Sequence, residues 1–553
     1  MLRSGRQAPM RWGSADTFVS DNPWAFRMGR PIANEGFLRA LLEYGSYDEY
    51  DIYCTDMNSQ AAFQAWLEEH CSDPAQRARV TALPHVAMAS RLAQLNYDVF
   101  HFGDFTSLLP HMVEARNRLA SKPFPITGIT HSLDGLLMST RYQQLVLSDL
   151  APFDAVVCTS ACAQQTVRKG LAWARSSLGL AEDFSPVSLE RVPLAMDDAL
   201  LQVPERAEAR ARFELPDDVV VALCIGRVAL RQKADWAPIL GKLARMRAGG
   251  GLGRVVVVIA GGGDEPDFAL LQQLIVAHGL QDSVICLPNF AAELKPYLYA
   301  AADFYFSMVD NFQETFGLTL LEAMAAGLPV LCSEFNGYRE LVTHGETGLL
   351  VPTTWVAELP SLFRSTEGLI QDSLMRLYMA QMVAIDLDEF ERSFRELVVN
   401  AELRRELGER GRQHAAGFTW RATIDRYEQL WERLRKRMTG SSWKPRSGPP
   451  RLKQDPAHAY GHYSSSLLGP EHSLELSELG RALLEQNNLV VRYEDMTVLL
   501  SDAVEEQILG ALAGGPCSLA QLREICREAL QTEAGLVDLQ VLWLLKHGAL
   551  RQR

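Results

Sequence analysis

The sequence lacks any run of 18 uncharged apolar residues, and its first five residues, Met1 to Gly5, lead into no apolar stretch. A membrane-spanning helix needs about 20 mostly apolar residues, and a secretory signal needs an apolar core. We therefore expect neither feature and predict a cytoplasmic protein. Paired cysteines are missing too, because the nine cysteines are scattered without any Cys-x-x-Cys spacing. That pattern argues against both a disulfide framework and a structural zinc site, so we expect reduced thiols.

A basic excess is also absent. The chain has 54 Lys and Arg against 68 Asp and Glu, a formal net charge of -14, which argues against a general nucleic-acid-binding surface. Apolar residues make up 47% and charged residues 22%, the balance of an ordinary globular protein. At about 150 residues per domain, the 553 residues predict two to four domains.

Short apolar runs alternate with helical patterns along most of the chain, which is typical of parallel α/β layering. The runs are apolar at nearly every position, as expected for strands covered on both faces. The predicted strands are Tyr50–Cys54, Val99–Phe102, Ile126–Ile129, Ala155–Cys158, Val219–Ile225, Arg254–Ala260, Val284–Leu287, Phe304–Ser307 and Val330–Cys332. The predicted helices between them include Glu35–Tyr44, Leu108–Leu119, Ala269–His278 and Leu318–Ala326.

The fold class that these patterns predict is α/β, with two doubly wound Rossmann-like domains at residues 1–204 and 205–418. Ala401–Met438 is strongly helical and charged, and its last part, 419–438, is set apart below. Residues 439–470, rich in Gly, Ser, Pro and basic side chains, are predicted to be a linker. Residues 471–553 are predicted to form a small, mainly helical, winged-helix-like module with helices at Ala503–Ala513, Ser518–Leu530 and Val537–His547.

Two candidate ligand motifs follow predicted strands of the second domain. Gly226-Arg227 comes directly after Val219–Ile225, and Lys233 lies on the same loop, so two cations stand at the edge where α/β domains bind ligands. They suit a diphosphate, or they are ordinary solvated loop cations. The turn Gly261-Gly262-Gly263 can bring its backbone against a ligand or the other domain, or can be a plain turn, and it is not a full G-x-G-x-x-G.

The third motif carries the most chemistry, because Glu314 and Glu322 are separated by seven residues around the start of a predicted helix. Gly317 lets the chain open the helix close to a bound group, and the amides near Phe316–Leu318 form an anion site. A phosphate can rest on these amides while a carboxylate accepts sugar or ribose hydroxyls. Two acids that merely complement the helix dipole are the simpler alternative, but that alternative does not account for the flanking Gly-Leu-Pro-Val.

The two spaced glutamates, Gly226-Arg227 with Lys233, and the segment from Glu340-Leu341-Val342 through Gly345-Glu346-Thr347-Gly348 to Pro352 together resemble the retaining glycosyltransferase family 4 with the GT-B fold. The resemblance is specific from about Arg191 to Arg433, weaker over residues 20 to 190, and absent from the last hundred residues. It implies two Rossmann-like domains that face a cleft, with the acceptor on the first and the nucleotide-sugar on the second. It also implies that residues 419–438 form a helix that crosses back onto the first domain.

The resemblance assigns roles residue by residue. It implies that Arg227 and Lys233 neutralise the donor diphosphate, that Glu322 holds the ribose hydroxyls and that Glu314 lies near the donor sugar. The amides of Phe316, Gly317 and Leu318 are implied to contact sugar and phosphate, and Asn289 and Phe290 to lie near the base. It implies that His131 faces the donor sugar, although without the resemblance His131 would be taken for a structural histidine. On the acceptor side the match is loose, and Gly29 is the candidate.

The chemistry that the resemblance implies is transfer of a hexosyl group, from a UDP-sugar first of all, with retention of configuration. Protein cations take the place of a metal, so neither a metal nor a cofactor is expected, and the nucleotide-sugar is a co-substrate. Front-face attack is expected, with the leaving phosphate assisting deprotonation of the acceptor. The acceptor stays open among glycans, lipid-linked sugars, peptides and small metabolites.

The basic region and the C-terminal module suggest other partners. Eight basic residues lie from Arg433 to Lys453 without an intervening acid. This region either contacts anionic lipid at the inner membrane face or an acidic partner, or is simply solvated. The module has thirteen acidic against seven basic residues and a mostly apolar last helix, which favours a protein partner over DNA. The segment Trp355–Asp386 is longer than the family pattern.

Two alternatives to an active transferase remain. One is a non-catalytic GT-B subunit that binds an acceptor or a partner protein, although such subunits usually lose the cations or the acid pair, and all four are present here. The other is a GT-B sugar-nucleotide epimerase, although the context of the two glutamates matches transferases.

Overall fold

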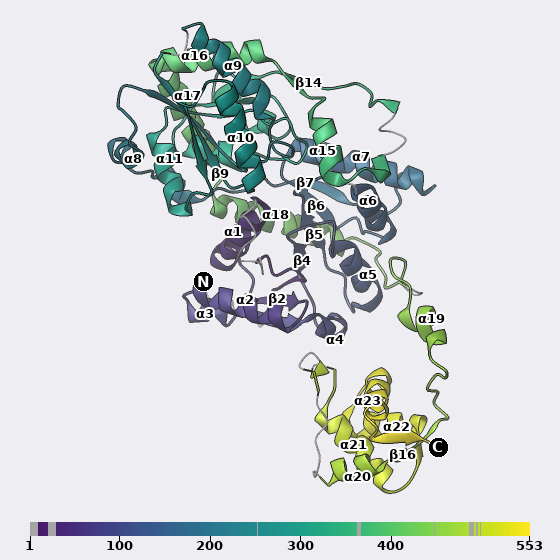
Figure 1. The fold of residues 1–553 in the computed structure, drawn as a ribbon. Coiled ribbons are helices and arrows are strands. Elements are labelled where there is room, and N and C mark those ends of the chain that lie inside the picture. The colour runs from purple at the N-terminus through teal and green to yellow at the C-terminus, as the bar shows by residue number, and fades with distance from the viewer. Residues whose placement is uncertain are drawn as a thin grey trace.

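The computed structural model describes residues 9–19, 29–135, 137–250, 253–361, 367–446, 448, 450–485, 492–493, 496–497 and 499–553. Two α/β domains and a small module follow one another along the chain, and the module lies below the first domain at the end of the linker (Figure 1). Each large domain has its own parallel sheet, so the predicted fold class is confirmed.

The first domain contains a seven-stranded parallel sheet in the order β3-β2-β1-β4-β5-β6-β7. Separate apolar clusters cover its two faces, one under α1 and α2 and the other under α5, α6 and α7. The elements are β1 Arg11–Ser14, α1 Gly29–Tyr44, β2 Glu49–Cys54, α2 Met57–His70, α3 Pro74–Arg77, β3 Val80–Pro84, α4 Met88–Gln94, β4 Val99–Phe102, α5 Leu109–Leu119, β5 Ile126–Ile129, α6 Met138–Leu147, β6 Ala155–Cys158, α7 Ala161–Ser177 and β7 Ser188–Arg191.

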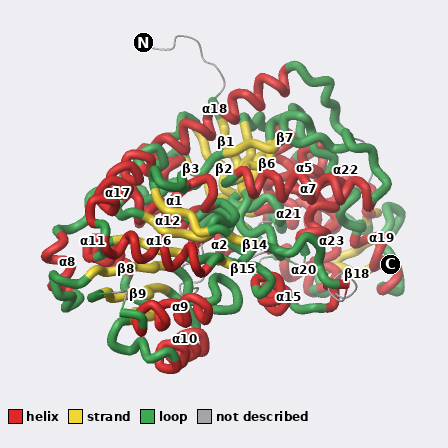
Figure 2. The backbone as a smooth tube through the Cα atoms, turned by 90° about the horizontal axis from the view of Figure 1, so that it is seen from above, coloured by secondary structure: helices red, strands yellow, loops and turns green. Residues whose placement is uncertain are grey.

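The second domain contains a six-stranded parallel sheet in the order β10-β9-β8-β11-β12-β13, again covered on both faces. Figure 2 shows α8 and α11 along one side of this sheet and α9 and α10 along the other. The elements are α8 Arg206–Arg212, β8 Val220–Ile225, α9 Trp236–Ala248, β9 Val255–Gly261, α10 Glu265–Ala277, β10 Val284–Pro288, α11 Lys295–Ala301, β11 Phe304–Ser307, α12 Leu318–Ala325, β12 Val330–Ser333, α13 Tyr338–Leu341, β13 Gly348–Val351, β14 Thr353–Thr354, α15 Asp372–Ala380, β15 Ala384–Ile385, α16 Leu387–Val399, α17 Ala401–Ala415 and α18 Trp420–Thr439.

The predicted helical stretch Ala401–Met438 is two helices rather than one. The chain breaks after Ala415, and Thr419 caps the second helix by accepting a hydrogen bond from the Ala422 amide at 3.3 Å. That second helix, α18, returns to the first domain and buries Tyr427 and Trp431 in its core. The indole of Trp431 donates to the hydroxyl of Thr127 on β5 at 3.1 Å, so α18 is fastened to the centre of the first sheet.

The linker after α18 contacts α5 of the first domain at four residues, so the alternative of a simply solvated linker does not hold for them. Trp443 donates from its indole to Asn117 Oδ1 at 3.2 Å, and the Arg446 amide donates to the Asn117 carbonyl at 2.5 Å. The amides of Arg451 and Leu452 both donate to the carboxylate of Glu114, which is only 5% exposed. We call the described residues of this stretch, 443–446, 448 and 450–452, the strap.

Most of the basic residues of this region have acidic partners within the chain. Arg433 and Arg437 pair with Glu190, Arg435 with Asp98, Lys436 with Glu432, Arg446 with Glu114 and Arg451 with Asp149. Their positive charge is therefore largely balanced by the protein itself. The contact with anionic lipid gains no support from this arrangement.

Replacing Glu114 with alanine should release the strap while leaving the first domain folded. Two backbone amides and one guanidinium lose their shared acceptor, and a hydrogen bond to a charged group contributes about 1.5–3 kcal/mol. Trypsin should then cleave between residues 440 and 453 at least about tenfold faster, because about 1.4 kcal/mol corresponds to a factor of ten in the opened population. The exposed Glu471→Ala variant is the matched control, and an unchanged cleavage rate in Glu114→Ala would refute the docked strap.

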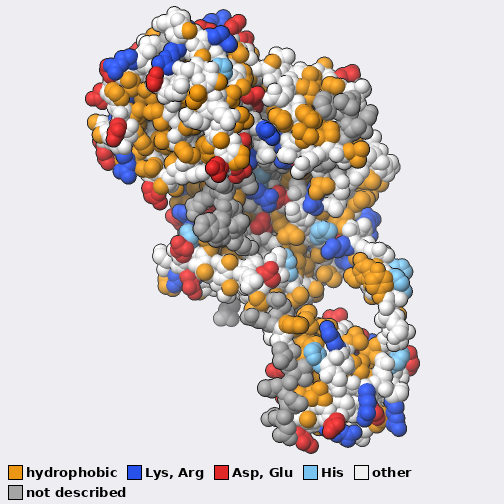
Figure 3. All heavy atoms as spheres, in the orientation of Figure 1, with side chains coloured by type: hydrophobic (Ala, Val, Ile, Leu, Met, Phe, Trp, Pro, Cys, Tyr) orange, Lys and Arg blue, Asp and Glu red, His pale blue; other side chains and the backbone are white. Residues whose placement is uncertain are grey.

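The C-terminal module has more strand than predicted, because an antiparallel sheet in the order β17-β16-β18 accompanies its helices. Its elements are α19 Pro456–Tyr460 in the connection, β16 Ser473–Leu476, α20 Glu478–Leu484, α21 Asp502–Ala513, β17 Cys517–Ser518, α22 Leu519–Leu530, α23 Ala534–Lys546 and β18 Leu550–Gln552. The three predicted helices match α21, α22 and α23 closely. They enclose a separate apolar core that includes Leu474, Ile508, Leu522, Val541 and Leu544. In Figure 3 the module stands away from the domains, connected through the linker.

Candidate functional site

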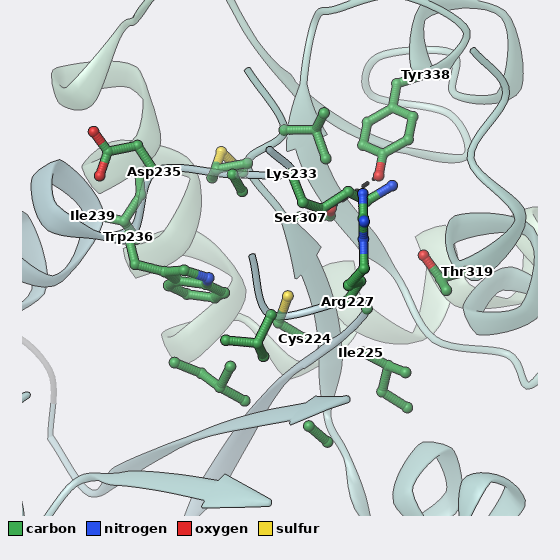
Figure 4. A pocket seen from close by; sticks show the side chains of 17 residues that line it. Cys224, Ile225, Arg227, Lys233, Asp235, Trp236, Ile239, Ser307, Thr319 and Tyr338 are labelled. Carbon is green, nitrogen blue, oxygen red and sulfur yellow. Dashed lines mark hydrogen bonds between the residues drawn. The ribbon is translucent and has the colours of Figure 1, made fainter. Parts of the chain in front are cut away.

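A hollow of about 480 Å³, partly open to solvent, lies at the carboxyl edge of the second sheet. Its walls are the ends of β8, β9 and β11, the loop after β8, the start of α9, Thr319 of α12 and Tyr338 of α13. Figure 4 shows Arg227 and Lys233 on this hollow together with Ser307 and Tyr338, whose hydroxyls are 3.0 Å apart. The position agrees with the rule that open α/β sheets bind ligands beyond the carboxyl ends of their strands.

The two predicted cations lie at this hollow, and each has a partner on the loop before α12. Arg227 donates to the side-chain oxygen of Gln313, and Lys233 forms an ion pair with Glu314. Burial lowers the pKa of Arg227, and the nearby guanidinium of Arg376 lowers it further. Both cations are therefore held in a partly dehydrated place, where an anion gains more from them than in water.

Glu314 is fixed from both sides in this arrangement. One carboxylate oxygen is paired with Lys233, and the other accepts the amides of Thr315 and Phe316, each at 3.2 Å. Burial alone would raise the pKa of Glu314, but Lys233 and the two amides outweigh it, so its pKa lies below the usual range. Glu314 is therefore ionised at neutral pH and occupies the groups that were predicted to bind phosphate and sugar.

The turn into α12 requires the glycine that the sequence supplies. Gly317 is the N-cap residue, with φ 110° and ψ 52°, a backbone conformation that L side chains rarely adopt. A Cβ atom there would lie 2.6 Å from the ring of Tyr338. Phe316 is 4% exposed and packs into the core of the domain, while Leu318 begins the helix. The amides of this turn are thus held in place by packing on both sides.

Glu322 lies one turn into α12 and is 5% exposed. The ammonium of Lys295 lies 2.6 Å from its carboxylate, and the hydroxyl of Tyr299 donates to Oε2 at 2.9 Å. Both partners come from α11, which the sequence analysis did not connect with the motif. They orient the carboxylate so that a hydroxyl pair of a ligand would meet an acceptor that is already in position.

The glycine-rich turn after β9 serves the packing of the chain. A Cβ atom on Gly261 would lie 1.6 Å from the carbonyl oxygen of Gly226, and one on Gly263 would lie 2.4 Å from that of Val228. Asn289, at φ 47°, binds this turn through its side chain, with Oδ1 accepting the Gly263 amide at 3.1 Å. The contacts of Gly261 and Gly263 therefore support the interpretation of a plain turn packed inside the domain, rather than an approach to a ligand or to the other domain. Phe290, the neighbour of Asn289, packs half-buried against the core.

His131 lies at the carboxyl edge of the first sheet, two residues after β5. Its Nε2 is 2.8 Å from the Gly103 carbonyl oxygen and 3.0 Å from Asn34 Oδ1, and both are acceptors. Burial, with the charge of Arg30 adding to it, lowers the pKa of His131 to about 4. The ring is therefore neutral at pH 7 with its proton on Nε2, which leaves Nδ1 as the acceptor nitrogen.

Three contacts bring the carboxyl edges of the two sheets together. Ser160 at the start of α7 donates to the carbonyl of Thr315 at 2.8 Å, and Glu340 of the second domain accepts the first amides of α7 at 2.6 and 2.8 Å. Arg376 of α15 pairs with Asp134 at 2.7 Å. His131 and Glu314 are close in sequence to Asp134 and Thr315, so both belong to loops at the boundary between the two domains, the recess in Figure 3 that we call the cleft. Gly29, the acceptor-side candidate, is the first residue of α1.

Within the described ranges, no group of three or more His, Cys, Asp or Glu side chains is placed to hold a metal ion. A search of the same ranges finds no helix with the length and apolar character needed to cross a bilayer. All nine cysteines are free thiols.

Comparison with known proteins finds a family model that matches part of the second domain. Residues 205–367 match the family model described as glycosyl transferases group 1. A D-inositol 3-phosphate glycosyltransferase of Saccharomonospora viridis is 28% identical over 249 residues, which are 44% of this chain and 49% of that protein. The enzyme of that name from Mycobacteroides abscessus is 34% identical, over 30% of this chain and 36% of its own. The chain therefore spans about half, or less, of these relatives.

Solved structures share the two-domain fold. HepE of Anabaena, in complex with UDP, aligns with a TM-score of 0.52 at 14% identity, covering 77% of this chain and all of that one. The sucrose-phosphate synthase of Thermosynechococcus elongatus aligns with a TM-score of 0.51 at 19% identity, covering 78% of this chain and all of its own. At these identities the likeness establishes the GT-B fold.

Proposed function

We propose that this chain, whose second domain belongs to the glycosyl transferases group 1 family, transfers a hexosyl group from a nucleotide-sugar to an acceptor with retention of configuration. The observation that carries the proposal is the arrangement around the hollow: Lys233 and the amide of Phe316 bind Glu314, and Arg227 binds the neighbouring Gln313. Glu322 stands one turn further along α12 with its carboxylate already oriented. A nucleotide-sugar offers a diphosphate for the two cations, a sugar for Glu314 and ribose hydroxyls for Glu322.

Glu314 binds the same groups that we propose for a phosphate. The ammonium of Lys233 is partly removed from water, where a lone charge is costly, and it and the Phe316 amide are satisfied by the carboxylate, whose place a phosphate would take. Binding would then exchange one anion for another and free Glu314 to accept hydroxyls of the donor sugar. This exchange favours a diphosphate over a neutral ligand, because only an anion can release Glu314.

The reaction we propose breaks the bond between the anomeric carbon and the diphosphate oxygen while the acceptor oxygen attacks the same face. Arg227, Lys233 and the helix amides stabilise the charge that develops on the diphosphate, in place of a metal ion. The acceptor hydroxyl gives its proton to an oxygen of the departing phosphate. His131, neutral and with Nδ1 as acceptor, would hold a hydroxyl of the donor sugar without transferring a proton.

The donor nucleotide we propose first is UDP, which HepE of the same fold binds in its crystals. The acceptor is not carried over from the relatives, since they are named for inositol phosphate and the chain covers half of their length. The module and the strap have no counterpart in the matched region, so any protein partner they bind is a separate proposal.

A thermal-shift panel of UDP, GDP, ADP and their sugars tests this function. A ligand at 100 times its Kd should add about 2.7 kcal/mol to the free energy of unfolding. We expect one nucleotide to stabilise the wild type, and Glu322→Ala to lose that response because the ribose acceptor is gone. Glu346→Ala, which removes an exposed glutamate outside the cleft, should keep it. If no nucleotide at millimolar concentration stabilises the wild type, the proposed function is wrong and a non-catalytic subunit becomes the better account.

A further inference from the structure

The described residues 353–361 and 367–385 form an arm on the second domain. Its two ends pair as the antiparallel strands β14 and β15 directly after β13, at the carboxyl edge that forms the cleft. Trp355 packs on Phe312, on the loop before α12, with ring centroids 4.9 Å apart. The side chain of Gln381 donates to Asp235 at 2.8 Å. The base of the arm is therefore fixed beside the hollow.

Helix α15 of the arm reaches across to the first domain, as seen where α15 lies beside α6 and α7 in Figure 1. The guanidinium of Arg376 meets the carboxylate of Asp134 with Nε to Oδ2 at 2.7 Å and Nη2 to Oδ1 at 3.5 Å. The side chain of Asp134 is 2% exposed and that of Arg376 is 18% exposed. This is a two-point ion pair, largely removed from water, between the two halves of the molecule.

A buried ion pair contributes little net stability, but breaking it leaves a dehydrated charge behind. When the two partners belong to different domains, the two hydrogen bonds of the pair are made in one placement of Arg376 against Asp134 only. The pair therefore specifies how these two segments meet more than it adds to the stability of either domain. A pair confined to one domain would not specify this contact.

The position of Asp134 connects this pair with the chemistry. Asp134 lies three residues after His131 on the loop that follows β5, and the ring of His131 is held only from its own domain, by Gly103 and Asn34. Arg376, a side chain of the second domain, forms an ion pair with this loop. Arg376 also lies close enough to the diphosphate cation Arg227 to depress the pKa of that residue, after the larger effect of burial.

We propose that Arg376 is a positioning residue, which pulls the loop of His131 onto the donor domain through Asp134 and so places His131 against the transferred sugar. The placement of His131 against a sugar rests on the proposed function, but the contact of the arm with the loop does not depend on it. The alternative is that the pair only stabilises the arm itself. The positioning role and this alternative predict different results, because they differ in which residues exchange their amide hydrogens faster when the ion pair is removed.

Hydrogen exchange of the full chain without nucleotide tests the contact of the arm with the loop. Arg376→Gln should raise the exchange rate at residues 127–135 about tenfold, and Arg376→Lys should raise it less. Asp134→Asn removes the other partner of the pair and should raise the rate by the same factor as Arg376→Gln. Arg392→Gln, which breaks an exposed pair on α16, is the control and should leave residues 127–135 unchanged. Increased exchange confined to 353–385 in both Arg376→Gln and Asp134→Asn would overturn the proposal.

Ligand binding tests the positioning, with the nucleoside diphosphate and nucleotide-sugar that stabilise the wild type. Arg376→Gln should bind the diphosphate within about twofold of the wild type, since Arg227, Lys233 and Glu322 remain, and should lower kcat about tenfold to a hundredfold. Equal losses for diphosphate binding and for kcat would assign Arg376 to the diphosphate site and overturn a positioning role. A wild type that binds no nucleotide refutes the proposed function alone, because the exchange result still decides whether the arm holds the loop.

Discussion

Alanine in place of Arg227 or Lys233 is expected to lower kcat by about a hundredfold to a thousandfold each, the range for removing one preorganised charge from a developing anion. Both side chains line the hollow. Among the described residues that line it, they are the two cations of the loop after β8, so they would face a departing diphosphate. Lys233→Ala has a second effect, because it leaves Glu314 buried without its ion-pair partner. The measurement is steady-state turnover of the nucleotide-sugar at saturating concentration.

Arg231→Ala is the matched control for these variants, since it removes an exposed cation from the same loop. It should retain turnover within about twofold. If Arg227→Ala and Lys233→Ala turn over at the rate of Arg231→Ala, the diphosphate does not leave against these residues and the proposed chemistry is wrong.

Breaking the Arg116–Asp154 pair should cost the first domain about 3–5 kcal/mol in the free energy of unfolding, because an uncompensated charge remains in the core. Both side chains are 0% exposed. Asp154 also accepts the amides of Ala151 at 2.7 Å and Ile126 at 2.9 Å, so it connects the starts of β5 and β6. Urea unfolding of Arg116→Leu, followed by tryptophan fluorescence, measures the loss.

The Arg116→Leu/Asp154→Leu double variant separates the lost pair from the stranded charge. It should be less destabilised than the sum of its single variants, since neither charge is left alone in the core. Arg527→Ala, which removes an exposed pair in the module, should not move the unfolding midpoint of the first domain. A single variant as stable as the wild type would show that water reaches this pair.

The strands that the sequence predicts well are four-residue runs that are mostly apolar. For β4, β5, β6 and β11 the predicted and observed bounds coincide, and each is buried at every position. The prediction missed β1 and β7, because Arg11–Ser14 and Ser188–Arg191 carry polar side chains within the strand. β1 is central to its sheet nevertheless, so its place comes from neighbouring strands rather than from its own composition.

The candidate site divides in the same way. Glu314 and Glu322 are eight positions apart on one loop and helix, so their relation can be read from the sequence. Lys295 and Tyr299 bind Glu322 from another helix, and Asn34 binds His131 from 97 residues away. The low pKa of His131 also depends on burial, which no local pattern reports. The strap escaped prediction because its acceptor, Glu114, lies over 300 residues earlier in the chain.

The docked strap also limits how far the C-terminal module can travel. Because the chain is held as far as Leu452, only Lys453 to His472 separate the last contact from β16. Twenty extended residues span at most about 70 Å, and a flexible chain of that length has a mean end-to-end distance of about 25 Å. A tether of this length keeps the module near the first domain at an effective concentration in the millimolar range, which is similar to the Kd of a weak ligand. Whatever molecule the module holds would meet the first domain at that concentration, so even a loosely bound one would be captured repeatedly at the same face.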